Sequence, residues 1–168
     1  MLKYLIVALA LCAVAHADDW TPKTGEEIRK IRVECLKENP LSNDQISQLK
    51  NLIFPNEPDV RQYLTCSAIK LGIFCDQQGY HADRLAKQFK MDLSEEEALQ
   101  IAQSCVDDNA QKSPTDVWAF RGHQCMMASK IGDKVRAFVK MIIEKETTTM
   151  RRKLKELTYK TTYYITKA

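Results

Sequence analysis

Six cysteines constrain the fold of this chain of 168 residues more than any other feature. Cys12 lies in an apolar leader, and the other five are Cys35, Cys66, Cys75, Cys105 and Cys125. An even set of cysteines in an exported domain indicates a disulfide framework, whereas a set of five leaves one sulfur over. The chain has no C-x-x-C pair, and His81 and His123 complete no recognisable ligand spacing. We therefore expect disulfides rather than a zinc site.

Residues 1–17 have the pattern of a secretory signal peptide. Lys3 gives a positive start, an apolar run follows from Leu5 to Val14, and Ala15-His16-Ala17 is a small-x-small cleavage site. The run is too short to span about 30 Å of hydrocarbon, which disfavours a transmembrane anchor. We expect a secreted, extracellular protein that begins at Asp18, in a compartment where disulfides persist.

The rest of the chain has apolar residues at helical spacing almost throughout. Together with capping residues, this spacing predicts six helices, at about 25–38, 43–53, 59–71, 81–89, 95–105 and 114–130. An apolar patch from Val135 to Ile143 could form a seventh. The expected fold is therefore all-α, a compact bundle of six to seven short helices over 18–140.

The C-terminal segment, 141–168, has a different composition. It holds seven Lys or Arg and three Glu, a net charge of +4, whereas 18–140 has a net charge of −2. A faintly acidic body is not typical of a nucleic-acid-binding protein. Because Thr147-Thr148-Thr149 are poor helix formers, we expect a mobile, basic, Thr/Tyr-rich extension. Two alternatives are a membrane-surface segment attracted to anionic lipid and an isoform or gene-model extension.

Over about Trp20 to Val139, the chain resembles the insect odorant-binding proteins of the pheromone and general odorant-binding group. In that family six cysteines link first to third, second to fifth and fourth to sixth. The second cysteine precedes the third by four residues, and the fifth precedes the sixth by nine. Those two positions are Gln62 and Asp116 here, so the missing cysteines are partners of each other. This is the pattern of the minus-C subgroup.

The resemblance implies the disulfides Cys35–Cys66 and Cys105–Cys125, each worth about 3–4 kcal/mol in the loop-entropy model. The lost bridge implies that the third and sixth predicted helices separate more easily than in six-cysteine relatives. Cys75 is left over, and we predict a buried free thiol that packs as a small apolar side chain. An intermolecular bridge and a redox-sensitive site are the alternatives.

The resemblance also implies a closed apolar cavity at the centre of the bundle. The residues predicted to line it are Leu64, Ile69, Phe74, Leu85, Phe89, Ile101, Trp118, Met127 and Phe138. For any one of them, packing in a filled core is the alternative. Val135 and Phe138 are expected to form a lid, and Arg121 or His123 to contact a ligand carboxylate, unless they are solvated surface residues.

The expected function is that of a carrier that binds and transports a small hydrophobic ligand, such as an odorant, pheromone, fatty acid or similar lipid. The carrier would be a monomer or weak dimer and would yield its ligand at a membrane receptor or membrane surface. Acid could trigger release, because unperturbed His81 and His123 protonate near pH 6. A helical signalling protein without a cavity and a small secreted lipid hydrolase are the alternatives. No hydrolase motif is present, so no enzyme activity, cofactor or metal is expected.

Overall fold

The computed structural model of the protein describes residues 20–167, so the predicted signal peptide lies outside the described residues. The helices in this range are α2 (Gly25–Glu38), α3 (Asn43–Lys50), α4 (Pro58–Lys70), α5 (Ala82–Phe89), α6 (Glu95–Cys105), α7 (Thr115–Ala128) and α8 (Lys130–Lys167). The two short strands are β1 (Phe74–Cys75) and β2 (Gly79–Tyr80). The predicted all-α fold is confirmed.

The helix starts follow from local hydrogen bonding. Ser42 Oγ accepts from the backbone N–H of Gln45, and the side chain of Gln45 accepts from the backbone N–H of Ser42. This reciprocal pair is a capping box at the start of α3. Helix α3 ends at Lys50, earlier than expected, because Leu52 adopts the left-handed conformation with φ 57°. Pro114 is the N-cap of α7 rather than its first helical residue.

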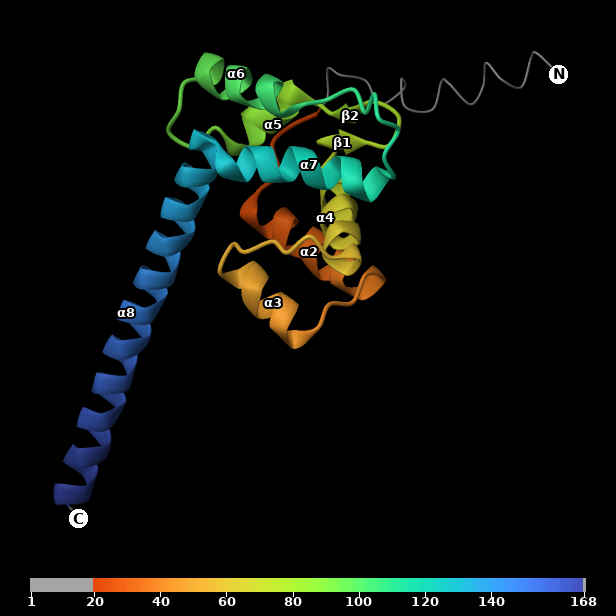
Figure 1. The fold of residues 1–168 in the computed structure, drawn as a ribbon. Coiled ribbons are helices and arrows are strands. Elements are labelled where there is room, and N and C mark those ends of the chain that lie inside the picture. Colours follow the sequence, from red (N-terminus) through yellow and green to blue (C-terminus); the bar gives the residue numbers. More distant parts are fainter. Residues whose placement is uncertain (1–19, 168) are drawn as a thin grey trace.

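The body has α5 and α6 at one end and α2 and α3 at the other, with α4 and α7 between them (Figure 1). The buried apolar core comes mainly from α4, α5, α6, α7 and the segment that contains the strands. The first turns of α8 also belong to this body, since Ile131 is buried in the same core and Val135 packs against it.

The sequence did not predict the β1–β2 hairpin, in which Phe74 pairs with Tyr80 and Cys75 with Gly79. Gly79 has a φ of 78°, and a Cβ added there would lie 2.4 Å from the indole of Trp118. Glycine is required at this position because both the backbone conformation and the close approach exclude a side chain. The hairpin thereby packs closely on α7.

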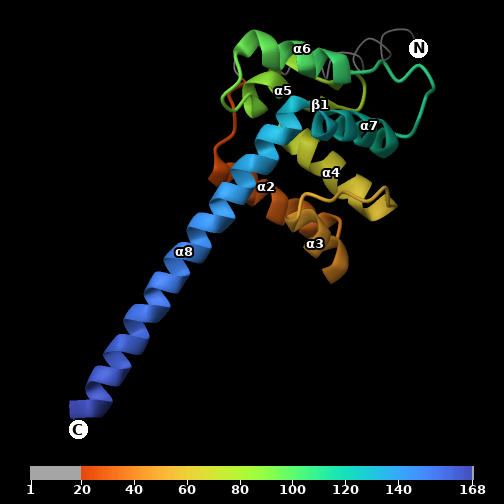
Figure 2. The ribbon, with the colours of Figure 1, turned by 60° about the vertical axis from the view of Figure 1, so that its left-hand side comes forward.

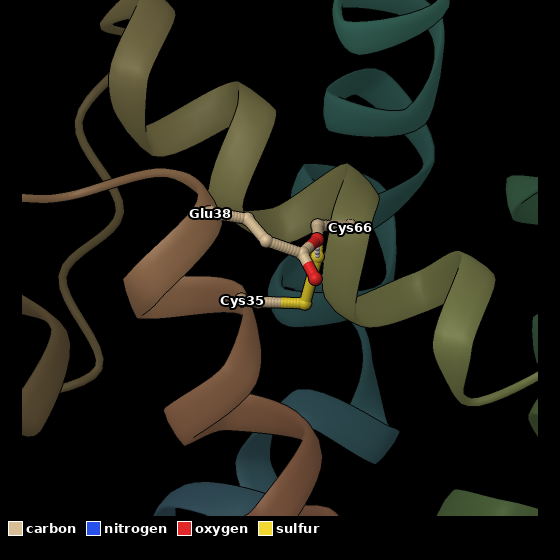
Figure 3. A group of neighbouring side chains, drawn as sticks. All are labelled: Cys35, Glu38 and Cys66. Atoms are coloured by element: carbon tan, nitrogen blue, oxygen red, sulfur yellow. Dashed lines mark hydrogen bonds between the residues drawn. A yellow bond between two sulfur atoms is a disulfide. The ribbon is translucent and has the colours of Figure 1, made fainter.

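Two disulfides join the helices in the pairs that the resemblance implies. Cys35–Cys66 connects α2 to α4, and Cys105–Cys125 connects α6 to α7, with Cα–Cα distances of 5.8 and 5.4 Å. Figure 3 shows the first bridge with the carboxylate of Glu38 beside it, 3.3 Å from the sulfur of Cys66. Because both sulfurs are bonded to each other, this cluster offers no thiolate to a metal ion.

The prediction that Cys75 is a buried free thiol is wrong. Cys75 is disulfide-bonded, and no cysteine in the described part of the chain is free. Its side chain is only half-buried, on β1 of the hairpin, and its sulfur lies 3.7 Å from Asp76 Oδ1.

The C-terminal segment also differs from expectation, because α8 runs through the threonines without a break. The hydroxyls of Thr147 and Thr148 donate to the carbonyls of Ile143 and Glu144, each at 2.8 Å, so the helix satisfies their polar atoms itself. Two views show α8 projecting far from the body (Figures 1 and 2). No described helix combines the length and apolar character needed to cross a membrane.

Candidate ligand-binding cavity

A cavity of about 330 Å³ lies among α2, α3, α4, α5, α7 and the start of α8. Its lining is mostly apolar, and α6 contributes no residue to it. The lining consists of Ile28, Ile31, Arg32, Leu36, Ile46, Leu49, Lys50, Leu52, Phe54, Tyr63, Leu64, Ser67, Ala68, Leu71, Ile73, Tyr80, Leu85, Phe89, His123, Met126, Met127, Ile131 and Val135. Cavities of this size and character suit small apolar molecules.

Four of the nine predicted residues lie at this cavity. They are Leu64 on α4, Leu85 and Phe89 on α5, and Met127 on α7. Val135, expected as part of a lid, also lines the cavity from the start of α8. The structure therefore brings together one side of the predicted site.

Phe74 and Trp118 belong to the packed core instead. The ring of Phe74 lies edge-on to Tyr80 and to Trp118, with centroid distances of 4.9 and 5.4 Å. The indole nitrogen of Trp118 donates to the carbonyl of Asp107 at 3.1 Å. These rings fill the space under the hairpin, and only Tyr80 also reaches the cavity.

The other three predicted lining residues point elsewhere. Ile69 is exposed, because it lies on the face of α4 that turns away from the cavity. Ile101 packs against the core from α6, which stands outside the cavity wall. Phe138 is exposed on α8 and does not line the cavity, although it was expected to form part of a lid.

Sequence reasoning missed the wall formed by α2 and α3. Ile28, Ile31 and Leu36 come from α2, and Ile46 and Leu49 from α3. Their helical spacing was visible in the sequence, but it did not show whether they face a filled core or a void. Helix α3 has no buried residue, which means that its apolar side faces the cavity and stays partly accessible.

His123 brings an unsatisfied polar atom to the cavity. Its ring lies edge-on to Phe54 at a centroid distance of 4.4 Å, and its Nε2 is fully buried without a hydrogen-bond partner among the described residues. Burial, and to a lesser degree the positive charge of Arg32, lowers the pKa of His123 to about 4. The imidazole is therefore neutral at pH 7 and has an unused hydrogen-bonding position.

The charged residues in the lining are all cations. Arg32 on α2 and Lys50 at the end of α3 are both exposed, which places them at the edge of the cavity. No Asp or Glu occurs among the lining residues. The cavity thus combines apolar walls with a positive edge.

Arg121 does not reach the cavity. Its guanidinium donates to both carboxylate oxygens of Asp107, at 3.0 and 3.1 Å, and to Ser113 Oγ at 2.9 Å. The hydrogen bonding of Arg121 to the Asp107 carboxylate is the largest cause that lowers the pKa of Asp107. Arg121 therefore fixes the α6–α7 connection and lies outside the cavity lining, although it was expected to contact a ligand carboxylate.

The histidines do not support an acid trigger near pH 6. Desolvation lowers the pKa of His81 as well, and nearby Arg84 adds to this effect. Both imidazoles are thus harder to protonate than a free histidine, and His123 stays neutral until about pH 4.

Comparison with known proteins agrees with this architecture. The model of the PBP/GOBP family matches residues 17–129. Odorant-binding protein 22 of Aedes aegypti is 30% identical over 130 residues, which cover 77% of this chain and 93% of that protein. General odorant-binding protein 99a of Drosophila melanogaster is 27% identical over 133 residues, which cover 77% and 92%. The chain therefore belongs to the PBP/GOBP family.

Proposed function

We propose that the protein is a secreted, non-enzymatic carrier that holds a small hydrophobic ligand in the cavity between α2 and α8. The observation that carries this proposal is the apolar space itself, about 330 Å³ walled by six helices. A ligand placed there gains roughly 25 cal/mol for each Å² of apolar surface removed from water. The relatives named as odorant-binding proteins and the leader sequence at 1–17 support the same role.

The polar atoms of the cavity favour a ligand with an acidic end. A carboxylate would accept hydrogen bonds from the guanidinium of Arg32 and from the neutral imidazole of His123 in the tautomer that protonates Nε2. It would satisfy the buried Nε2, which otherwise costs about 1–3 kcal/mol. A fatty acid fits these requirements better than a hydrocarbon or an ester.

We also propose that the chain belongs to the minus-C subgroup, and that an ion pair takes the place of the disulfide this subgroup lacks. Arg61 Nε on α4 donates to Asp116 Oδ2 on α7 at 2.8 Å, and both side chains are largely buried. This ion pair links the two helices at the position where the family bridge would lie. Oxidised Gln62→Cys plus Asp116→Cys should still raise the unfolding free energy, by less than about 3–4 kcal/mol because the ion pair is lost.

Displacement of an apolar fluorescent probe tests the carrier proposal. Leu64→Trp fills the cavity from α4 and should weaken probe binding at least about tenfold, since each 1.4 kcal/mol is a factor of ten. Ile69→Trp on the opposite face of the same helix is the matched control and should leave the affinity unchanged. Equal affinities for both variants would place the probe outside the cavity.

The affinities of a fatty acid and of the alcohol of the same chain length test whether the cavity prefers an acidic end group. Arg32→Gln should weaken acid binding about tenfold or more, because charged hydrogen bonds are worth about 1.5–3 kcal/mol, and should leave the alcohol unaffected. Arg29→Gln on the same helix, outside the cavity lining, is the control. If the alcohol binds as tightly as the acid, the carrier proposal stands, and the proposal that the ligand has an acidic end group is wrong.

A further inference from the structure

Helix α8 carries an apolar stripe that the body does not cover. Ile143, Met150, Leu154 and Leu157 have relative exposures of 51, 64, 57 and 61%. With Thr147, these residues follow each other at steps of four, three, four and three, which places them on one face of a helix. Five residues of this helix, Ile143, Thr147, Met150, Arg151 and Leu154, line a shallow groove on it.

Thr147 is the one polar residue of the stripe, and it is compatible with apolar surroundings. The Thr147 hydroxyl donates to the carbonyl of Ile143 at 2.8 Å, which uses its donor within the helix and lessens the cost of apolar surroundings. The stripe lies in the part of α8 that projects from the body in both views (Figures 1 and 2). It also lies beyond the residues matched by the family model, which end at 129.

A cluster of cations lies beside the distal half of this stripe, whereas Glu144 and Glu146 lie beside its first turn. Arg151, Arg152, Lys153 and Lys155 occupy four of five consecutive positions, and 141–168 has a net charge of +4. At 3.6 residues per turn, Arg151 and Lys153 lie on the two sides of the stripe and Arg152 lies on the opposite face. An apolar face with basic residues beside it is the pattern of a helix that lies in a membrane interface.

We propose that the stripe Ile143–Thr147–Met150–Leu154–Leu157 binds the surface of an anionic lipid membrane. The apolar side chains would enter the acyl boundary, while Arg151 and Lys153 meet the negatively charged headgroups. A second copy of the chain suits the segment less well than an anionic surface, because 141–168 has a net charge of +4 that a second copy would double and an anionic membrane would neutralise. Crossing the membrane is not implied, since α8 is not apolar enough to span it.

The same helix connects this face to the cavity. Ile131 and Val135 at the start of α8 line the cavity, and Leu157 follows Val135 by about 33 Å at 1.5 Å per residue. A membrane bound at the stripe would therefore be tethered to the cavity through one continuous helix. The proposal itself depends only on the distal stripe and not on what the cavity binds.

Co-sedimentation of the mature chain, beginning at Asp18, with vesicles tests the proposal. Binding is expected to vesicles of phosphatidylcholine mixed with phosphatidylserine and not to phosphatidylcholine alone, and should weaken as salt is added. Met150→Gln plus Leu154→Gln should weaken binding more than tenfold, since each apolar side chain contributes roughly 1.5–3 kcal/mol. Arg151→Gln plus Lys153→Gln should weaken it about thirtyfold at roughly 1 kcal/mol per cation.

The matched control removes the same charge from the body through Arg29→Gln plus Lys37→Gln on α2, and should leave vesicle binding nearly unchanged. Probe binding in the cavity checks that each variant is folded and keeps this test separate from the carrier proposal. Equal binding to neutral vesicles, or no binding to either kind, would overturn the proposal. Lipid-free self-association that the Met150 and Leu154 changes abolish would overturn it in favour of a second copy.

Discussion

The body and the distal part of α8 are both helical, but different interactions stabilise them. The body has a shared buried core and two disulfides between its helices. From Met141 onward, α8 exposes its large apolar side chains, among them Ile143 and Met150. The hydroxyls of Thr147 and Thr148 donate to the backbone of the same helix. Since isolated helices are marginal in water, the body and distal α8 have equal secondary structure but very unequal local stability.

The largest expected effect comes from the disulfides. Cys35→Ala plus Cys66→Ala should lower the unfolding free energy of the body by about 2–5 kcal/mol, because the α2–α4 connection is lost. Hydrogen exchange followed residue by residue should show faster exchange throughout the body, with distal α8 already fast in the unmodified protein. Distal amides protected as strongly as those of α4 would contradict the contrast.

The next effect concerns pH and is confined to the body. The folded state holds the pKa of His123 at about 4, against about 6.5 when unfolded, so the unfolded chain binds the proton first as pH falls. Stability is therefore unaffected at pH 7 and is lost between about pH 6.5 and 4, by about 3 kcal/mol at 1.36 kcal/mol per pKa unit. In denaturation experiments, the unfolding free energy of His123→Leu should therefore fall by about 3 kcal/mol less between pH 6.5 and 4 than that of the unmodified protein. A parallel pH profile for both proteins would contradict the burial of His123.

A smaller effect is expected at the hairpin. Gly79→Ala forces a left-handed residue and a contact with Trp118, and should destabilise the body by about 1–3 kcal/mol in thermal or urea unfolding. Gly25→Ala is the control, because nothing lies within 4 Å of its added Cβ. Equal stability of the two variants would mean that the hairpin does not press on α7 as described.

The smallest effect on the body should come from breaking α8. Thr148→Pro removes helical hydrogen bonding in the projecting segment and should lower the helical circular dichroism signal. It should change the unfolding free energy of the body by no more than about 0.5 kcal/mol, since exposed sites away from the core contribute little. Thr148→Ala keeps the helix and serves as control. A large drop in body stability would show that distal α8 packs on the body.

Much of the fold could be predicted because its signals are local. The bounds of α2 follow from a capping residue and a helical stripe, and the cysteine spacing leads to both disulfide pairs through the family resemblance. The hairpin was missed because strands of two residues have no detectable periodicity. The continuity of α8 was missed because propensity penalises Thr147 and Thr148, whereas their hydroxyls bond to the preceding turn.

The site was predictable only in part because a cavity is a property of several helices at once. Leu64 and Ile69 lie on the same helix, but only Leu64 faces the cavity. Trp118 and Phe89 are both large aromatic residues on predicted helices, so the sequence does not distinguish them. Only the packing of Trp118 under the hairpin shows that it belongs to the core, whereas Phe89 lines the cavity. The unpaired Nε2 of His123 depends on what surrounds it in three dimensions, which no spacing in the sequence reveals.

Helix α3 has a consequence for how fast a ligand is exchanged. It forms one wall of the cavity, yet it buries no residue and neither Cys35–Cys66 nor Cys105–Cys125 is attached to it. Displacing α3 opens that wall while α2, α4, α6 and α7 stay joined in their pairs. In the proposed carrier, we therefore expect α3 to be the wall that moves when a ligand enters or leaves, while the disulfide-linked helices stay in place.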